Sequence, residues 1–225
     1  MVMTFRRKNW FGMLAAFVGM IFISGPALLA EEPANANDTA TKRIVILGDS
    51  ITAGYGLDQA QAYPALLQEK IHAAKLPYTV ANAGVSGDTT AGGLRRIAWA
   101  TARGADVLII ALGGNDGLRG ISPEETKKNL LGIIAKARAK NPDIEILIAG
   151  MEMPDNMGPD FTARFKAVFP ESAEETGITL IPFLLEGIGG VEKLNQPDGI
   201  HPTPEGQAVV AENVWSILQP LITQH

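Results

Sequence analysis

The chain has 225 residues, of which 46% are hydrophobic, which is enough apolar material for one domain with a sizeable core. Its formal net charge of −5 argues against a general nucleic-acid binder, because phosphate contacts need clustered lysine and arginine. The sequence has no cysteine, which excludes disulfides, zinc–thiolate sites, a cysteine nucleophile and lipid attachment to cysteine. Only His72, His201 and His225 are available for metal binding or acid–base chemistry.

The N-terminal segment has the layout of a secretory signal peptide. Basic residues at 6–8 precede an apolar run over 10–30, and a polar stretch follows at 31–38. We predict a signal peptide over residues 1–30, with cleavage after Ala30 or, alternatively, after Ala36. An uncleaved anchor is the other interpretation, because about 20 apolar residues can span a bilayer. Both interpretations place the rest of the chain outside the cytoplasm, periplasmic or secreted, since the positive charges stay inside.

Loss of the first 30 residues makes the remaining chain more acidic. This segment holds three basic and no acidic residues, so its removal leaves 16 basic against 24 acidic residues and a net charge of −8. Such a surface favours solubility and is not attracted to anionic membranes. We expect a monomer without stable membrane insertion after signal cleavage.

After a polar linker over 31–42, short apolar runs alternate with helix-like segments. The runs are rich in Val, Ile and Leu without strict alternation, which is typical of strands buried on both faces of a parallel sheet. We predict strands at 43–48, 78–83, 106–112, 144–150 and 178–182, and helices at 60–75, 88–103, 122–140, 159–176 and 203–219. This order predicts an α/β domain over 43–225, a three-layer α/β/α sandwich around a mainly parallel five-stranded sheet.

The loop after the first strand contains a candidate nucleophile. In parallel α/β folds, ligands bind outside the carboxyl ends of the strands, so these loops are where chemistry is expected. The first strand runs into Gly48-Asp49-Ser50, which puts Ser50 at a strand-to-helix turn among small residues. The alternative is that Ser50 only caps the following helix, a common role for serine.

The next two loops contain candidate hydrogen-bond donors. Gly87 follows the second strand, and without a side chain its N–H could approach an oxyanion; the alternative is a turn glycine before a helix cap. Asn115 follows the third strand on a glycine-rich turn, where its amide could point into the same crevice or form an Asx-turn. This turn lacks the spacing of a dinucleotide fingerprint and the Lys-Ser/Thr pair of a P-loop.

Near the C-terminus, Asp198 stands three residues before His201. The aspartate can hold one ring nitrogen of the histidine, which leaves the other free to take a proton from a serine. A simple loop contact is the alternative for the histidine. Together the four loops hold a nucleophile, a base, a group that orients the base, and oxyanion donors, which is what acyl transfer requires.

The motifs in these loops resemble those of the SGNH (GDSL-type) hydrolase family. Four blocks occur in the family's order: Gly48-Asp49-Ser50, Ser86-Gly87-Asp88, Gly113-Gly114-Asn115-Asp116 and Asp198-x-x-His201. The flanking residues are similar to the periplasmic branch of acyl-thioesterases, lysophospholipases and arylesterases. The resemblance implies a flavodoxin-like α/β/α fold, a catalytic triad of Ser50, Asp198 and His201, and an oxyanion hole formed by the N–H groups of Ser50 and Gly87 and the side chain of Asn115.

This chemistry requires neither a metal nor an organic cofactor. We expect small acyl or aryl esters, acyl thioesters or lysophospholipids as substrates. The loop at 155–159 is predicted to form part of the pocket wall. Five nearby side chains could line an acyl channel, although helix packing suits most of them better: Met151, Met153, Met157, Phe161 and Phe165. A carbohydrate O-acetylesterase and a non-catalytic binding domain on the same fold are the alternative functions, whereas a dinucleotide enzyme would need a glycine fingerprint after the first strand.

Overall fold

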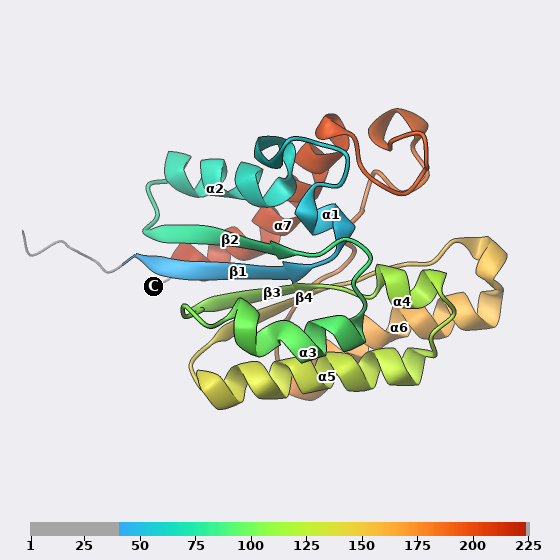
Figure 1. Cartoon of the computed structure of the whole chain (residues 1–225), viewed down its shortest axis with the longest axis horizontal. Helices are drawn as coiled ribbons and strands as arrows, with labels where there is room; N and C mark the ends of the chain where they lie inside the picture. The colour runs from blue at the N-terminus through green and yellow to red at the C-terminus, as the bar shows by residue number, and fades with distance from the viewer. Residues whose placement is uncertain (1–40, 224–225) are drawn as a thin grey trace, which may run out of the picture. The chain divides into compact units, whose positions relative to one another are not determined.

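Five parallel strands form the centre of the computed structural model, which describes residues 41–223 (Figure 1). The strands lie in the order β2-β1-β3-β4-β5, and every neighbouring pair is parallel. Their bounds are Lys42–Gly48 for β1, Tyr78–Gly84 for β2, Val107–Ala111 for β3, Glu145–Ala149 for β4 and Thr179–Ile181 for β5. The prediction of a parallel five-stranded sheet is confirmed, and each predicted strand lies within two residues of its observed bounds.

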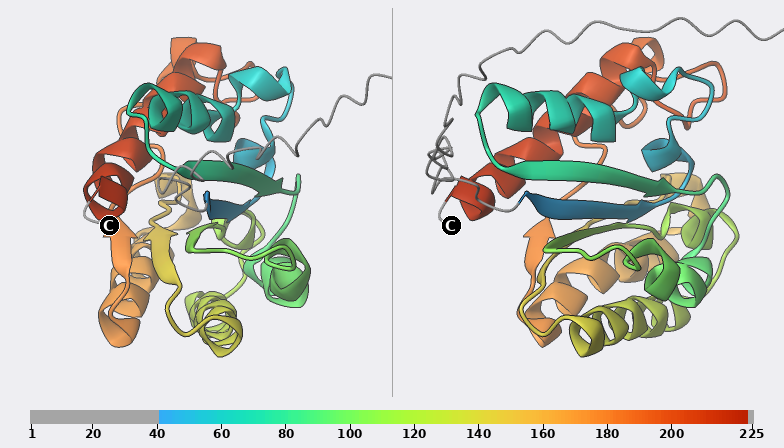
Figure 2. Two further views of the ribbon diagram at one scale, coloured as in Figure 1. Left: turned by 90° about the vertical axis from the view of Figure 1, so that its left-hand side faces the viewer. Right: turned by 60° about the vertical axis from the view of Figure 1, so that its left-hand side comes forward.

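Helices cover both faces of the sheet (Figures 1 and 2). One face carries α2 (Tyr63–Ala73) and α7 (Pro204–Thr223), which pack against each other. The opposite face carries α3 (Thr90–Ala100), α5 (Pro123–Lys140) and α6 (Pro159–Thr176), of which α5 contacts both neighbours. The predicted three-layer α/β/α sandwich is therefore confirmed.

The start of α5 carries residues typical of a helix start, namely Ser122 followed by Pro123 and Glu124. Ser122 is the N-cap of α5, and its side chain accepts a hydrogen bond from the N–H of Glu125 at 3.2 Å. The side chain of Glu125 forms an ion pair with Lys128, three residues further along the same helix, at 3.3 Å. The last helix continues past its predicted end, because α7 includes Pro220 and runs to Thr223.

Several short helical turns were not predicted. They are α1 (Ser50–Ala53), α4 (Gly114–Leu118) and the 3₁₀ turns η1 (Gln59–Gln61), η2 (Asp155–Met157) and η3 (Glu192–Leu194). Each has three to five residues, which is too short for a hydrophobic period to appear in the sequence. Two of them, α1 and α4, contain the candidate residues Ser50 and Asn115.

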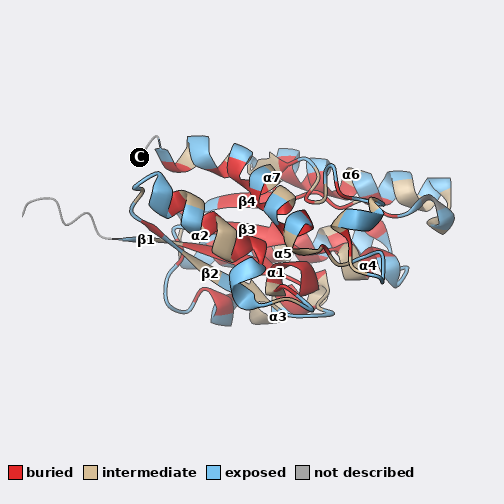
Figure 3. Ribbon diagram, turned by 90° about the horizontal axis from the view of Figure 1, so that it is seen from above, coloured by how far each residue is buried: buried red, intermediate tan, exposed pale blue. Residues whose placement is uncertain are grey.

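The core is centred on the inner strands, which Figure 3 shows as buried. All five residues of β3 are buried, as are residues 44–48 of β1. Burial of one Ile or Leu side chain stabilises a protein by roughly 1.5–3 kcal/mol, so these strands hold their positions firmly. The loops that leave their carboxyl ends consequently start from fixed points.

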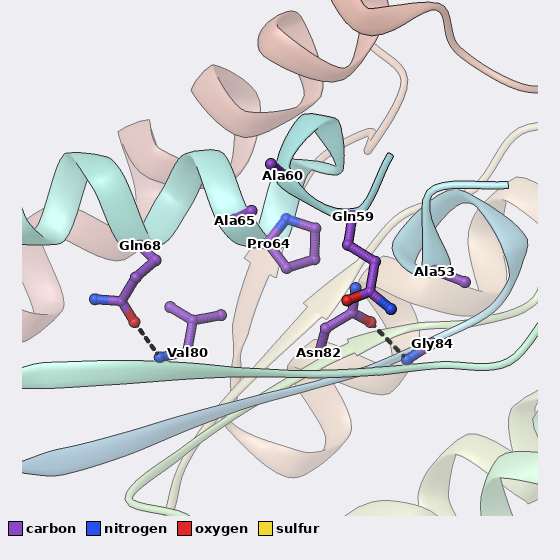
Figure 4. A pocket seen from close by; sticks show the side chains of 9 residues that line it. All are labelled: Ala53, Gln59, Ala60, Pro64, Ala65, Gln68, Val80, Asn82 and Gly84. Atoms are coloured by element: carbon purple, nitrogen blue, oxygen red, sulfur yellow. Dashed lines mark hydrogen bonds between the residues drawn. The ribbon is translucent and has the colours of Figure 1, made fainter. Parts of the chain in front are cut away.

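The edge strand β2 is protected along its free side by side-chain amides. Gln68 of α2 accepts a hydrogen bond from the N–H of Val80 at 2.7 Å and donates one to the carbonyl of Tyr78 at 3.2 Å. Further along, the N–H of Gly84 donates to Asn82 at 2.9 Å. Figure 4 shows these amides in a hollow between α2, η1 and β2. The occupied backbone groups discourage the addition of another strand at this edge.

The described residues belong to one structural unit, which spans Thr39–His225. The predicted signal peptide over 1–30, and most of the linker, lie outside the described residues, as does His225. Within residues 41–223, no helix is long and apolar enough to cross a membrane.

Candidate active site

Ser50 is the first residue of α1, directly after the end of β1. The N-cap of this helix is Asp49, whose Oδ1 accepts a hydrogen bond from the N–H of Ile51 at 3.1 Å. Gly48 must lack a side chain, because a Cβ there would lie 1.9 Å from the hydroxyl of Thr52. The alternative that Ser50 serves as the helix cap is therefore wrong, and its hydroxyl is available for another role.

The hydroxyl of Ser50 lies at one end of a chain of three side chains. Its Oγ is 2.9 Å from Nε2 of His201, and Nδ1 of the same ring is 2.7 Å from Oδ2 of Asp198. The serine and the histidine are 151 residues apart in the sequence. With a proton on Nδ1, shared with Asp198, the Nε2 lone pair can accept the serine proton.

The turn from Asp198 to His201 is fixed by its own backbone. Oδ1 of Asp198 accepts hydrogen bonds from the N–H groups of Ile200 at 2.9 Å and His201 at 3.0 Å. Together with the bond from the imidazole, these lower the pKa of Asp198 to about 2, the bond from the His201 backbone contributing most. Gly199 has a φ of +70°, a conformation that favours glycine. Asp198 is consequently ionised at any pH where the protein would act.

Two residues that the sequence did not indicate support His201. The ring of Tyr55 lies against the imidazole, with 4.5 Å between the ring centroids. Gln196 donates to the backbone carbonyl of Tyr55 at 2.8 Å, and its own N–H donates to the carbonyl of His201 at 2.7 Å. These contacts join the loop after α1 to the Asp198–His201 turn.

Asn115 is held against the residue that precedes Ser50. It lies in the first turn of α4, and its Nδ2 donates to Oδ2 of Asp49 at 3.3 Å. Burial raises the pKa of the Asp49 carboxyl to about 6, although the N–H of Ile51 and the charge of His201 act in the opposite direction. The candidate donor Asn115 and the candidate nucleophile are thus joined through one buried carboxyl group.

The loop that contains Gly87 is attached to the strand ends by an arginine. Arg96 of α3 donates to the carbonyls of Gly48 at 2.8 Å and Ala83 at 2.7 Å, and it forms an ion pair with Asp88 at 2.6 Å. A second arginine, Arg119, donates to the carbonyl of Gly87 at 2.9 Å. Gly87 has a φ of +77°, a conformation that favours glycine. Arg96 therefore fixes the Gly87 loop relative to the end of the strand that precedes Ser50.

A buried polar network joins the loops of Gly87 and Asn115. Asp116, the neighbour of Asn115, is fully buried and accepts hydrogen bonds from both the N–H and the hydroxyl of Thr90, at the start of α3. Asn129 of α5 donates to the same hydroxyl at 3.2 Å. Burial raises the pKa of Asp116. The network connects α4, α3 and α5 beneath the candidate oxyanion donors.

The remaining candidates lie elsewhere. His72 is exposed in the last turn of α2, which runs away from the carboxyl ends of the strands. Met151, Met153 and Phe165 are buried in the core, whereas Met157 and Phe161 are partly buried against it, so packing accounts for all five. Among residues 41–223, no group of three or more His, Cys, Asp or Glu side chains could hold a metal ion.

The pKa of Asp49 gives a prediction for stability. Because burial raises this pKa from 3.8 to about 6, the folded state holds a proton that the unfolded state has lost, and stability falls as pH rises across this window. Asp49→Asn keeps an acceptor for the Ile51 N–H but does not titrate. We expect the free energy of unfolding in urea to be higher for this variant than for the wild type at pH 8, by up to roughly 3 kcal/mol for two pKa units, and little changed at pH 4. The exposed Asp143→Asn variant is the control, and an equal gain at both pH values would contradict the prediction.

At the carboxyl edge of the parallel sheet, a serine hydroxyl is hydrogen-bonded to an imidazole, which is hydrogen-bonded to a carboxylate. This arrangement defines the α/β serine hydrolases as a class. Residues 46–209 match the model of the GDSL-like Lipase/Acylhydrolase family. The chain belongs to this family.

Three known proteins illustrate the similarity. The esterase TesA of Pseudomonas aeruginosa is 42% identical over 184 residues, 81% of this chain and 90% of the relative, and a crystal structure of TesA has a TM-score of 0.77 over 80% of this chain and 99% of that one. Thioesterase 1/protease 1/lysophospholipase L1 of Escherichia coli K12 is 36% identical over 81% of this chain and 86% of the relative. The psychrotrophic esterase EstA of Pseudoalteromonas, in a structure inhibited by monoethylphosphonate, is 30% identical with a TM-score of 0.76 over 81% and 99% of the two chains.

Proposed function

We propose that this chain hydrolyses carboxylic esters and thioesters through an acyl-enzyme formed on Ser50, with His201 as general base and Asp198 as its partner. The observation that carries the proposal is the continuous hydrogen-bonded chain from Oγ of Ser50 through the imidazole to Asp198, with lengths of 2.9 and 2.7 Å. The family and the esterase and thioesterase names of the relatives support the same reaction.

Each group has a defined part in the proposed reaction. Ser50 Oγ attacks the acyl carbonyl while Nε2 of His201 takes the hydroxyl proton, and the resulting imidazolium is stabilised by Asp198. The tetrahedral intermediate collapses as His201 gives the proton to the leaving alcohol or thiol. A water molecule, deprotonated by the same imidazole, then attacks the acyl-enzyme, and the imidazolium returns the proton to Oγ of Ser50 as the acid leaves. No step needs a metal or an organic cofactor.

The developing oxyanion would be stabilised by the N–H groups of Ser50 and Gly87 and by the amide of Asn115. Preorganisation of these donors is supported by the bonds that hold them: Asn115 to Asp49, and the Gly87 loop to Arg96 and Arg119. Donors that are fixed before the reaction need no reorientation as charge develops, which is why such sites lower the barrier more than water does.

Asn115→Ala tests the oxyanion role. Because the donor acts mainly on charge that develops in the transition state, we expect kcat to fall by roughly 10²- to 10³-fold with little change in KM. Steady-state kinetics on a p-nitrophenyl ester, with thermal unfolding measured in parallel, would check this. A normal kcat combined with a clear loss of thermal stability would assign Asn115 to turn geometry instead.

The substrate class that fits the proposal comprises small acyl or aryl esters, acyl thioesters and lysophospholipids, and the loop at 155–159 is proposed to form part of the pocket wall. We also propose that residues 1–30 form a signal peptide, and that the domain over 43–225 acts outside the cytoplasm as a monomer that binds no nucleic acid. The basic, apolar and polar stretches at the N-terminus support export.

A hydrolysis screen tests the proposed function directly. Purified protein would be assayed on p-nitrophenyl esters of graded acyl length and on an acyl thioester of matched chain length. We expect turnover of both bond types, with an optimum at one range of acyl length. Failure to hydrolyse every ester and thioester, in protein whose circular dichroism shows it to be folded, would overturn the proposal.

A further inference from the structure

Exposed apolar side chains are concentrated around the candidate active site. Among the described residues, five large hydrophobic side chains are exposed: Tyr55, Val85, Trp99, Leu118 and Ile200. Four of them, all except Trp99, are 45–52% exposed and lie on the four loops that carry the candidate site residues. We name Tyr55, Val85, Leu118 and Ile200 the apolar rim.

Contacts place two members of the rim beside the triad. The ring of Tyr55 lies 4.5 Å from the imidazole of His201, centroid to centroid. Ile200 directly precedes His201, and its N–H donates to Asp198 at 2.9 Å. The Tyr55 side chain therefore lies against the histidine that is hydrogen-bonded to Ser50, and Ile200 is the neighbour of this histidine in the chain.

The other two members lie beside the candidate oxyanion donors. The N–H of Val85, two residues before Gly87, donates to the carbonyl of Gly48 at 3.0 Å. Leu118 ends the short helix α4, which has Asn115 in its first turn. Each of the four loops therefore contributes one exposed apolar side chain at the edge of the sheet where Ser50 lies.

The charges of the same loops favour contact with a lipid headgroup layer. The chain is acidic overall, but the four acidic residues of the site motifs are either buried, as Asp49 and Asp116 are, or paired, as Asp88 is with Arg96 and Asp198 with His201. Arg119, which is exposed, donates to the carbonyl of Gly87 at 2.9 Å and adds a positive charge beside the rim. A surface with apolar side chains, few free carboxylates and one exposed guanidinium suits phosphate-bearing amphiphiles.

We infer that the apolar rim docks reversibly on the surface of aggregated single-chain phospholipids, so that the enzyme takes its substrate from micelles. This inference rests on the proposed ester hydrolysis and adds the physical state in which the enzyme meets its substrate. Docking removes the rim side chains from water and holds the acyl ester next to Ser50. Four partly exposed side chains provide a contact that is reversible, in contrast to insertion of a membrane-spanning helix.

The test compares rim variants with a matched variant elsewhere. Val85→Ser, Leu118→Ser and the double variant remove rim side chains that make no described contact with Ser50, His201 or Asp198. Trp99→Ser removes the fifth exposed hydrophobic side chain, which is 74% exposed in the last turn of α3, at the end away from the site. Each protein would be assayed on one lysophosphatidylcholine below and above its critical micelle concentration, and on soluble p-nitrophenyl butyrate.

We expect the wild-type rate on the lysophospholipid to rise steeply as micelles form. The rate of the double variant should fall about tenfold on micelles and no more than about twofold on either dispersed substrate. The rate of Trp99→Ser should match that of the wild type on all substrates. An equal loss on dispersed and micellar lysophospholipid would overturn the inference, because the rim would then contact single acyl chains. A loss of micelle activity in Trp99→Ser of the same size would also overturn it.

A binding measurement separates this inference from the proposed function. Dodecylphosphocholine has the same headgroup but no carboxylic ester, so co-elution of the protein with its micelles in gel filtration reports docking without hydrolysis. Binding that is weakened in the double variant supports the inference even for a protein that hydrolyses no ester, an outcome that would count against the proposed function alone. Hydrolysis of soluble esters without any binding to these micelles would overturn the rim inference alone.

Discussion

Ser50→Ala is expected to abolish both turnover and labelling by a phosphonofluoridate probe. If the Ser50 hydroxyl is the nucleophile, no other group can form the acyl-enzyme, and the residual rate over water should be too small to detect in a standard assay, a loss of at least roughly 10⁴-fold. The probe reacts with an activated serine to give a phosphonylated enzyme, so mass spectrometry of the labelled peptide identifies the residue. The wild-type protein should carry one label, on Ser50.

The same variant should fold normally. Removal of one hydroxyl leaves the apolar residues of β1 in place, and Asp49 still caps α1 through the Ile51 N–H. Thermal unfolding would confirm this and exclude a trivial loss of activity. Ser86→Ala is a suitable control, because this serine is in the next candidate loop. Labelling that persists in Ser50→Ala at another serine, or turnover that survives, would contradict the assignment.

The fold could be predicted from the sequence because its strands are continuous apolar runs. Residues 44–47 of β1 and all of β3 are buried on both faces, and this double burial is what makes their sequence uniformly Val, Ile, Leu and Ala. The capping residue Ser122 also behaves as its sequence context indicates. Such features are local, so neighbouring residues are sufficient to identify them.

The side chains that hold the loops of the candidate site in place could not be predicted in the same way. Gln196 contacts Tyr55 across 141 residues, and Arg96 reaches the carbonyl of Gly48 across 48 residues. Nothing in the local sequence distinguishes these side chains from other polar residues on a helix or a loop. Their positions follow from tertiary packing, which a single sequence without an alignment does not report. The proximity of Ser50 and His201 could be predicted from two features: loops after parallel strands meet at one edge of the sheet, and the four motifs resemble those of the SGNH family.

Asp49 shows how a site residue can act against stability. The residue is 2% exposed, and burial raises the pKa of its carboxyl, a cost that a hydrophobic or amide side chain in the same place would avoid. Its bonds to the Ile51 N–H and to Asn115 connect the nucleophile loop to a candidate oxyanion donor. A buried acid in this position is therefore better explained by placement of the site than by stability of the fold.

His201→Gln is expected to remove nearly all activity, whereas His72→Gln should leave the rate and its pH dependence unchanged. Glutamine can hold a position near Ser50 but cannot accept the hydroxyl proton, so the loss should be of the order of 10⁴-fold or more. His72 is exposed in the last turn of α2, so His72→Gln is a matched control that also removes one imidazole. A variant His72→Gln that moves the acid limb, with wild-type rates in His201→Gln, would contradict the proposed triad.

The pH profile of the wild-type protein should have an acid limb and an alkaline plateau. A general base works only when it is neutral, so kcat/KM should fall at acid pH, where the imidazole takes up a proton, and level off at alkaline pH. Asp198, with a pKa of about 2, stays ionised between pH 5 and pH 8, whereas Asp49, with a pKa of about 6, titrates within this interval and interacts with the charge of His201. Asp49→Asn separates the two groups, because it removes one titration and leaves the imidazole. We expect this variant to retain an acid limb that follows one ionisation, and a flat profile between pH 5 and pH 8 would show that Asp49, and not His201, controls the rate.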